Sequence, residues 1–379
     1  MSCPVDRHPA GPGGSRRARI GILSQMDADL PPVPALDHEA VLAAADVRDR
    51  LSVGAFGVWA SVIDLLAGAR GSVEAPLRPR PRLTVFAADH DIADLAVSAT
   101  PPTETQRRAG RLATGTGFAA GLAAASGTTV SVVDVGLRES TPQVPDRIAG
   151  ARPAGRIDVV DALDADGLAA AVRAGRDRAD AAVDSGSDLL IAATCGVGVS
   201  TPVAVLTAAL TAMEPVDATS RGSGIDDNAW IRKAAAVRDG LFRVRRAGGN
   251  SLDMLRVGGG PDLAALTGFI AQAATRKTPV IIHDLPSTVA AVLAHRLAPG
   301  ADTFFIVSSL APERGHPRLL DLLGHEPLTD WSMTGHSGVG ALMLLPSLLA
   351  AVAAFDGIDR AAMPTRTPDA ISTWDATLL

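Results

Sequence analysis

Apolar positions between residues 81 and 307 of the 379-residue chain follow two alternating patterns. Short, nearly continuous apolar runs predict strands at 83–88, 128–135, 188–193, 279–283 and 303–307. Helical periodicity predicts helices at 104–125, 166–184, 202–212, 227–245, 261–276 and 287–297. Strands separated by such helices form parallel βαβ units with right-handed crossovers, so the pattern predicts an α/β fold.

Helical segments flank this alternation on both sides. Residues 37–68 carry helical periodicity that Gly54 and Gly57 interrupt, and a leucine-rich segment at 318–324 precedes the uncharged run 337–355. Pro346 and Ser347 interrupt that run, and alanine supplies much of its hydropathy. We therefore interpret it as a buried helix and not as a membrane span.

Composition narrows the class of protein. The net charge of −6 argues against a general nucleic-acid surface, and two cysteines, Cys3 and Cys195, cannot make a disulfide framework. Residues 1–19 are polar and lack the apolar core of a signal peptide. We expect a cytoplasmic protein that binds neither nucleic acid nor membrane.

Two lysines, Lys233 and Lys277, survive among 35 basic residues that are otherwise arginine. Because the compact ammonium and the planar guanidinium differ in shape and hydration, a retained lysine hints that arginine would not serve. Chance survival is the alternative, and for Lys277 we prefer it.

Polar and glycine-rich loops follow several predicted strands, at the sheet edge where α/β proteins bind ligands. The loop 194–201 combines glycines with Ser200 and Thr201, and backbone N–H groups of such a loop can hold a phosphate. A second glycine-rich loop spans 333–341.

Five ordered blocks resemble one family, the nicotinate-nucleotide:dimethylbenzimidazole phosphoribosyltransferases of cobalamin assembly, over residues 31–357. The blocks are 86–102, 222–233, 257–263, 297–301 and 313–316. The loop 333–341 (Met-Thr-Gly-His-Ser-Gly-Val-Gly-Ala) aligns with the family's Met-Arg-Leu-Gly-Glu-Gly-Thr-Gly-Ala, whose glutamate is the catalytic base. Ordered blocks with near-constant spacing are far more specific than one glycine motif.

The resemblance implies a Rossmann-like parallel-sheet domain with helices on both faces, and a small helical domain from both chain ends. The expected divisions are a flexible tail (1–30), a helical part (31–80), the nucleotide-binding domain (81–340), a second helical part (341–358) and a tail (359–379). It implies a dimer and a reaction without cofactor or metal. A benzimidazole nitrogen displaces nicotinate from nicotinate mononucleotide while a carboxylate takes the ring proton.

The chain departs from the family where the chemistry takes place. Ser337 replaces the catalytic glutamate, Thr194 a second carboxylate, and Thr334 an arginine that holds the phosphate. Arg107 replaces a glutamine of the acceptor segment, and His283-Asp284 replaces a strand-end Asp-Gly.

Candidate site residues follow from this comparison, each beside an alternative. As catalytic groups we consider His336, a new base or a loop histidine, with Ser337 and Asp91. Residues predicted to bind the nucleotide or its phosphate are Gly196, Gly198, Ser200, Thr201, Lys233, Ser308 and Gly338. Residues predicted to line the acceptor are Asp89, His90, Ser98, Thr100, Arg107 and His283.

For five side chains in these segments, a simpler explanation stands beside the functional one. Arg107 and Arg108 either meet an anionic acceptor or pair with Glu104 at helical spacing. His283 and Asp284 orient one another, bind a metal, or, as neighbours in extended chain, point apart. Cys195 is expected to be a packed residue and not a reactive thiol.

Two functions remain open from the sequence. In the first, the chain transfers phosphoribose from nicotinate mononucleotide, or a related nucleotide, to a heterocycle; we favour an acceptor other than dimethylbenzimidazole, with dimethylbenzimidazole itself as the alternative. In the second, it is an inactive homologue that partners or regulates an active family member, as a homodimer or heterodimer.

Overall fold

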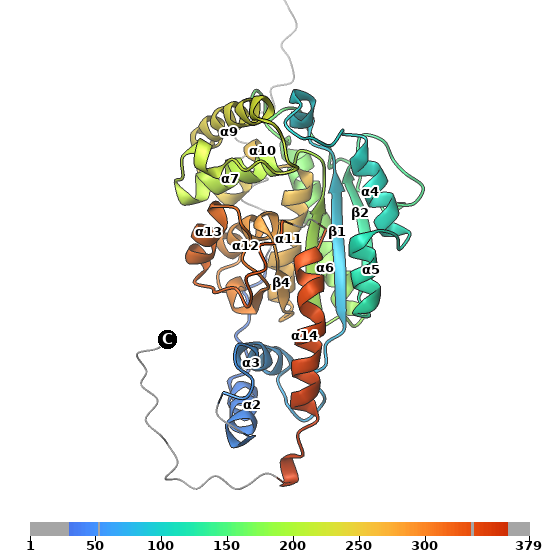
Figure 1. Cartoon of the computed structure of the whole chain (residues 1–379), viewed down its shortest axis with the longest axis vertical. Helices are drawn as coiled ribbons and strands as arrows, with labels where there is room; N and C mark the ends of the chain where they lie inside the picture. Colours follow the sequence, from blue (N-terminus) through green and yellow to red (C-terminus); the bar gives the residue numbers. More distant parts are fainter. Residues whose placement is uncertain (1–29, 52–53, 335–336, 363–379) are drawn as a thin grey trace, which may run out of the picture.

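The computed structural model describes residues 30–51, 54–334 and 337–362. Within them one parallel sheet has the strand order β2-β1-β3-β4-β5 (Figure 1). The strands are β1 (Pro81–Ala88), β2 (Thr129–Gly136), β3 (Leu189–Cys195), β4 (Val280–Ile282) and β5 (Phe305–Val307). Every pairing between neighbouring strands is parallel, so the predicted α/β fold class is confirmed.

Helices connect the strands and extend beyond them. They are α2 (His38–Leu51), α3 (Trp59–Arg70), α4 (Glu104–Ala113), α5 (Phe118–Ala125), α6 (Ala165–Asp184), α7 (Ser200–Thr211), α8 (Pro215–Ala218), α9 (Asp227–Ala247), α10 (Ser251–Gly258), α11 (Pro261–Thr275), α12 (Leu285–Leu297), α13 (Gly315–Leu323) and α14 (Val339–Asp356). Short 3₁₀ turns are η1 (Asp91–Leu95), η2 (Ala301–Phe304) and η3 (Arg360–Ala362).

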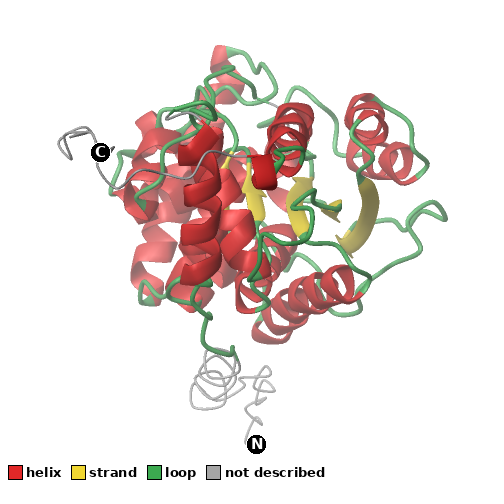
Figure 2. Cartoon of the chain, turned by 90° about the horizontal axis from the view of Figure 1, so that it is seen from below, coloured by secondary structure: helices red, strands yellow, loops and turns green. Residues whose placement is uncertain are grey.

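Helices cover both faces of the sheet, which Figure 2 shows from below. The step from β1 to β2 runs opposite to the later steps, so right-handed crossovers place α4 and α5 on one face and α6, α11 and α12 on the other. Contacts agree, because α11 packs closely on α6 and also on α12, while α5 packs on β2 and α14. The strands between these layers are almost wholly buried.

The two ends of the described chain meet below the sheet, where α2 and α3 lie beside the end of α14 (Figure 1). The Asp356 carboxylate accepts hydrogen bonds from the backbone N–H groups of Leu77 (2.7 Å) and Arg78 (3.1 Å). The rings of Phe56 and Phe355 meet edge to face with centroids 6.1 Å apart. These contacts tie the last helix to the connector that precedes β1.

α14 is long and apolar enough to cross a membrane by length and composition alone, yet half of it is buried inside the fold. Leu344, Leu345 and Leu348 each have an exposed fraction of zero. This agrees with the interpretation of the run 337–355 as a buried helix. The predicted tails, 1–30 and 359–379, lie almost entirely outside the described residues.

Several predicted boundaries were wrong. The helix predicted at 104–125 is two helices, because Gly115 (φ 74°) and Gly117 (φ 97°) adopt left-handed backbone between α4 and α5. The helix α10 was not predicted at all; Asn250 caps it, accepting from the backbone N–H of Asp253. β5 is shorter than predicted because its first residues form η2.

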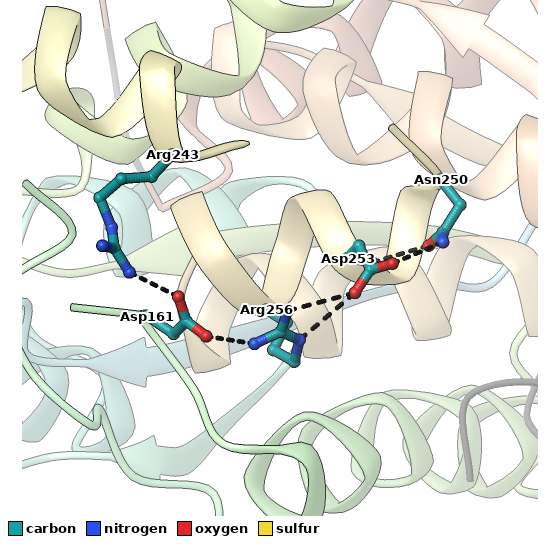
Figure 3. A network of polar contacts seen from close by, with 5 residues as sticks. All are labelled: Asp161, Arg243, Asn250, Asp253 and Arg256. Carbon is teal, nitrogen blue, oxygen red and sulfur yellow. Dashed lines mark hydrogen bonds and ion pairs between the residues drawn. The ribbon is translucent and has the colours of Figure 1, made fainter. Parts of the chain in front are cut away.

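A polar network fixes α9 against α10 and the segment before α6 (Figure 3). Arg243 of α9 donates to Asp161 (2.6 Å), whose other oxygen pairs with Arg256 of α10. Arg256 also reaches Asp253, which accepts from the side chain of Asn250 (2.7 Å). This network holds the far end of the helix that carries Lys233 near its beginning.

Candidate active site

The strand order reverses direction between β1 and β3, and ligands of doubly wound sheets bind outside the carboxyl ends of the strands at such a point. Here Asp89-His90 follows β1 and Gly196 follows β3. A side chain at Gly196 would lie 2.5 Å from the carbonyl oxygen of Ala88, and one at Gly260 would lie 2.7 Å from the His90 ring. The close approach of these loops therefore requires glycine.

His90 is buried and pairs with Asp262 of α11, with Nε2 3.0 Å from Oδ2. Burial alone would lower the pKa of His90, but the carboxylates of Asp262, Asp89 and Asp91 outweigh it and raise the pKa. The imidazole is thus engaged inside the protein, as a link between the β1 loop and α11. Asp89 is likewise engaged, since its Oδ2 accepts from the backbone N–H of Arg138 (2.9 Å).

Lys233 is completely buried in α9, and its ammonium points at the loop that follows β3. Nζ donates to Ser200 Oγ and to the carbonyl oxygen of Ser220, both at 2.9 Å. Burial lowers the pKa of Lys233 to about 8, and the Glu313 carboxylate opposes the shift. At neutral pH this is a mostly protonated cation whose three donors are shared between two protein partners and the adjacent space.

A shallow pocket adjoins this ammonium; its cavity volume is about 20 Å³, and the space between protein atoms is about 400 Å³ when the open solvent at its mouth is counted. Ser200, Ser220, Gly222, Glu313 and Thr334 line it. A side chain at Gly222 would lie 3.0 Å from Ser200 Oγ and 3.2 Å from Lys233 Nζ, so glycine leaves the space beside both polar groups unfilled; Ser200 lines the pocket, and Lys233 is fully buried next to it. We call this the Lys233 pocket.

Buried polar atoms without a hydrogen-bond partner among the described residues gather at the same edge of the sheet. They are Thr194 Oγ1, Thr201 Oγ1, His283 Nδ1, Asp284 Oδ2, Ser308 Oγ and Glu313 Oε2. Thr194, His283 and Ser308 stand at the carboxyl ends of β3, β4 and β5, three neighbouring strands. An unpaired buried polar group costs about 1–3 kcal/mol, so this concentration is typical of a site completed by a polar ligand.

His283 and Asp284 face each other, which corrects the expectation that neighbouring residues point apart. His283 Nδ1 lies 3.4 Å from Asp284 Oδ2, because Asp284 is the N-cap of α12 and turns its carboxylate back over the helix start. His283 Nε2 lies 3.2 Å from the carbonyl oxygen of Ala192, which assigns the ring proton to Nε2 and leaves a lone pair on Nδ1. Within the described chain no third histidine, cysteine or carboxylate joins the pair to form a metal site.

The acceptor segment after β1 is joined to the loop before α9. Ser98 Oγ lies 3.1 Å from Ser223 Oγ, and Thr100 accepts a long hydrogen bond from Arg108 (3.4 Å). Arg107 is 70% exposed and lies 3.9 Å from Glu104, which is the ion-pair alternative.

Two of the three predicted catalytic groups can be placed. Asp91 is ion-paired with Arg138, whose guanidinium lies 2.8 Å from its carboxylate. Ser337 has left-handed backbone (φ 60°) and hydrogen-bonds to the thiol of Cys195, whose pKa burial raises to about 11. Cys195 is thus a packed thiol, as expected. His336 lies outside the described residues.

Among the other predicted phosphate residues, Gly198 and Thr201 shape the loop that follows β3, whereas Gly338 stands at the start of α14. Gly198 has φ 91°, and the backbone N–H of Thr201 donates to its carbonyl oxygen (2.9 Å). Gly338 (φ 84°) starts α14, and a side chain there would lie 2.7 Å from Leu83.

Sequence reasoning gave no role to Asp262 or Glu313. Glu313 belongs to a family-like block and follows β5, so its position after a strand end was a usable signal. The pairing of Asp262 with His90 joins residues 172 positions apart and left no local signal.

Comparison with known proteins gives consistent matches along the chain. A phosphoribosyltransferase family model matches residues 33–363. The nicotinate-nucleotide–dimethylbenzimidazole phosphoribosyltransferase of Mycobacterium ulcerans (strain Agy99) is 41% identical over 330 residues, covering 86% of this chain and 92% of that protein. The protein of the same name from Mycobacterium tuberculosis is 40% identical over 358 residues, covering 89% of this chain and 99% of that protein.

Among solved structures, CobT from Thermus thermophilus superposes with a TM-score of 0.77 at 30% sequence identity. The superposition covers 84% of this chain and 96% of the Thermus protein. The similarity therefore extends over both the sheet and the flanking helices.

Proposed function

This chain belongs to the nicotinate-nucleotide–dimethylbenzimidazole phosphoribosyltransferase family, and we propose that it transfers phosphoribose to a heterocyclic acceptor other than dimethylbenzimidazole. The donor is nicotinate mononucleotide or a related nucleotide. The observation that supports this proposal is that the donor half of the site is kept whereas its catalytic carboxylates are replaced. The buried Lys233–Ser200 pair of the donor half is kept, whereas Ser337 and Thr194 replace the family carboxylates.

The Lys233 pocket supports the donor half of the proposal. The buried ammonium, the serine hydroxyl and the glycine-rich loop together provide a positive charge and hydrogen bonds for a bound anion. Both interactions are strong here because the site is partly shielded from water. Thr334 lines the same pocket in place of the family arginine. Lys233 is then the main cation for the phosphate, with hydroxyl groups completing the contacts.

The acceptor half has a different polar character. Thr194 offers a hydroxyl group in place of a carboxylate, and His283 offers an imidazole lone pair. Such an edge suits a heterocycle with a ring N–H and further polar substituents.

We assign the acceptor proton to His283 among the described residues. One ring nitrogen of the acceptor attacks the anomeric carbon, the bond to the nicotinate nitrogen breaks, and its electron pair stays on nicotinate. The N–H proton of the acceptor moves to His283 Nδ1, and Asp284 stabilises the resulting imidazolium at 3.4 Å. His336 remains the alternative base.

Turnover assays with single variants separate the two histidines. The wild-type chain is incubated with nicotinate mononucleotide and a panel of azoles and fused imidazoles, and released nicotinate is measured. We expect the His283→Asn variant to lose at least about a hundredfold in kcat, typical of losing a general base, with smaller change for His336→Asn. The reverse order would assign the proton to His336.

The alternative function is that of an inactive partner of an active family member. It is favoured because Ser337 and Thr194 replace both family carboxylates. Calorimetry with nicotinate mononucleotide decides between them. Binding without nicotinate release for any acceptor supports the inactive partner. No binding would refute the unchanged donor. The homodimeric or heterodimeric state is a linked proposal, tested by light scattering with and without the paralogue.

A further inference from the structure

Glu313 is a carboxylate with no assigned role at the wall of the Lys233 pocket. It also borders a wider groove that shares Ser220 with that pocket. Its Oε2 is buried and has no hydrogen-bond partner among the described residues. Burial raises the pKa of Glu313, its own backbone N–H and Lys233 oppose this, and Asp284 adds to it.

The charges at the two sides of the pocket are opposite but not joined. Lys233 and Glu313 interact electrostatically, yet the structure of residues 30–51, 54–334 and 337–362 contains no ion pair between them. Lys233 donates its hydrogen bonds to Ser200 and Ser220 instead. Glu313 and Ser200 therefore line the same pocket, and the Lys233 ammonium bonded to Ser200 is a separate charge next to it.

These anchors require a ligand with two unlike ends. An ammonium with a serine hydroxyl binds an anion, while an ionised carboxylate accepts hydrogen bonds only and repels phosphate oxygens. The end near Glu313 must therefore present hydrogen-bond donors such as hydroxyl groups. A phosphorylated sugar has this chemistry, with an anion at one end and a diol at the other.

We propose that Glu313 is a specificity-determining residue that accepts hydrogen bonds from the ribose hydroxyls of the donor while Lys233 and Ser200 hold its phosphate. This inference rests on the proposed function, because it assigns the sugar part of that donor. The carboxylate would then select ribosyl over deoxyribosyl donors and set the orientation of the anomeric carbon.

The test compares ligands and variants by calorimetry on the full chain. The probes are inorganic phosphate, ribose 5-phosphate and 2-deoxyribose 5-phosphate. We expect the wild type to bind ribose 5-phosphate at least about tenfold more tightly than the other two, since a hydrogen bond to a charged group contributes about that much. Equal affinities for the three probes in the wild type would overturn the inference without any variant.

Glu313→Gln keeps the shape and removes the charge. We expect this variant to lose the preference for ribose 5-phosphate and to bind inorganic phosphate at least as well as the wild type. Glu214→Gln is the matched control, because Glu214 is exposed and does not line the pocket. An unchanged preference in Glu313→Gln refutes the role of Glu313, while retained phosphate binding leaves the donor pocket intact.

A different result would contradict the proposed function itself. If the wild type binds none of the three probes, the Lys233 pocket is not a phosphate site, and both proposals fall. Urea unfolding of Glu313→Gln, with a midpoint near that of the wild type, excludes misfolding as the cause of a lost preference.

Discussion

Replacing Lys233 with methionine should change how stability depends on pH. The pKa of this lysine falls from 10.5 to about 8 on folding, a shift of 2.5 pH units and about 3 kcal/mol. Because the folded-state pKa is the lower one, between pH 8 and 10.5 the unfolded chain binds the extra proton. Wild-type stability therefore gains up to about 3 kcal/mol across this window, and the Lys233→Met variant lacks that gain.

Few other side chains of this protein titrate between pH 8 and 10.5, because the chain has no tyrosine and two lysines. Urea unfolding followed by tryptophan fluorescence at pH 7, 8, 9 and 10.5 gives both stability curves. Contributions from Cys195 are common to both proteins and cancel in the difference. Lys277→Met is the control, since Lys277 is exposed and its removal should leave the pH dependence unchanged.

Parallel curves for wild type and Lys233→Met would refute the reasoning, because they would mean that the ammonium is not held in a desolvated site. The same variant should also lose inorganic phosphate binding. In the wild type, phosphate affinity should fall as pH rises through about 8, where the unliganded ammonium deprotonates.

Three further predictions follow from other positions. Ser337→Glu alone should produce no dimethylbenzimidazole ribotide by chromatography, because other site residues also differ; detectable product would contradict this. Gly175→Ala should lower the urea midpoint sharply, since its Cβ would lie 1.9 Å from the Ala265 carbonyl oxygen, whereas Gly121→Ala, with open space, should raise stability by about 0.5–1 kcal/mol. Burial lowers the pKa of His316 to about 4. Its contribution to the free energy of unfolding, up to about 3 kcal/mol, is therefore present above pH 6.5 and is lost as pH falls toward 4. The free energy of unfolding of His316→Gln, measured with urea, should fall less steeply than that of the wild type over this pH range.

The fold was predictable because its signals are local and repeated. Continuous apolar runs such as 188–193 are typical of strands buried on both faces. The first residue of a helix such as α6 is indicated by its N-cap, Asp164, which accepts a hydrogen bond from the backbone N–H of Gly167. The predicted helix boundaries were wrong where the local sequence favours more than one backbone conformation. The glycines between α4 and α5 are compatible with a helix that continues or one that stops, and packing decides.

The site was predictable only in part, because its polar contacts join distant residues. That Lys233 carries the buried cation could be inferred from its retention among arginines, but its partner at Ser220 is a backbone carbonyl with no sequence signal. The mutual approach of His283 and Asp284 depends on the N-cap conformation of Asp284, which a strand-end dipeptide does not reveal. Whether His336 is the base stays a prediction.

The clamp between Asp356 and the connector before β1 has a consequence for how the protein is made. α14 is the last described long helix to leave the ribosome, yet Gly340 at its start packs on the His283 carbonyl, 2.8 Å from where a side chain would begin, and its end holds Leu77 and Arg78. A nascent chain can assemble the sheet during synthesis but cannot close this wall until α14 has been made. A chain cut short before α14 would thus lose the contacts at His283, Leu77 and Arg78 together.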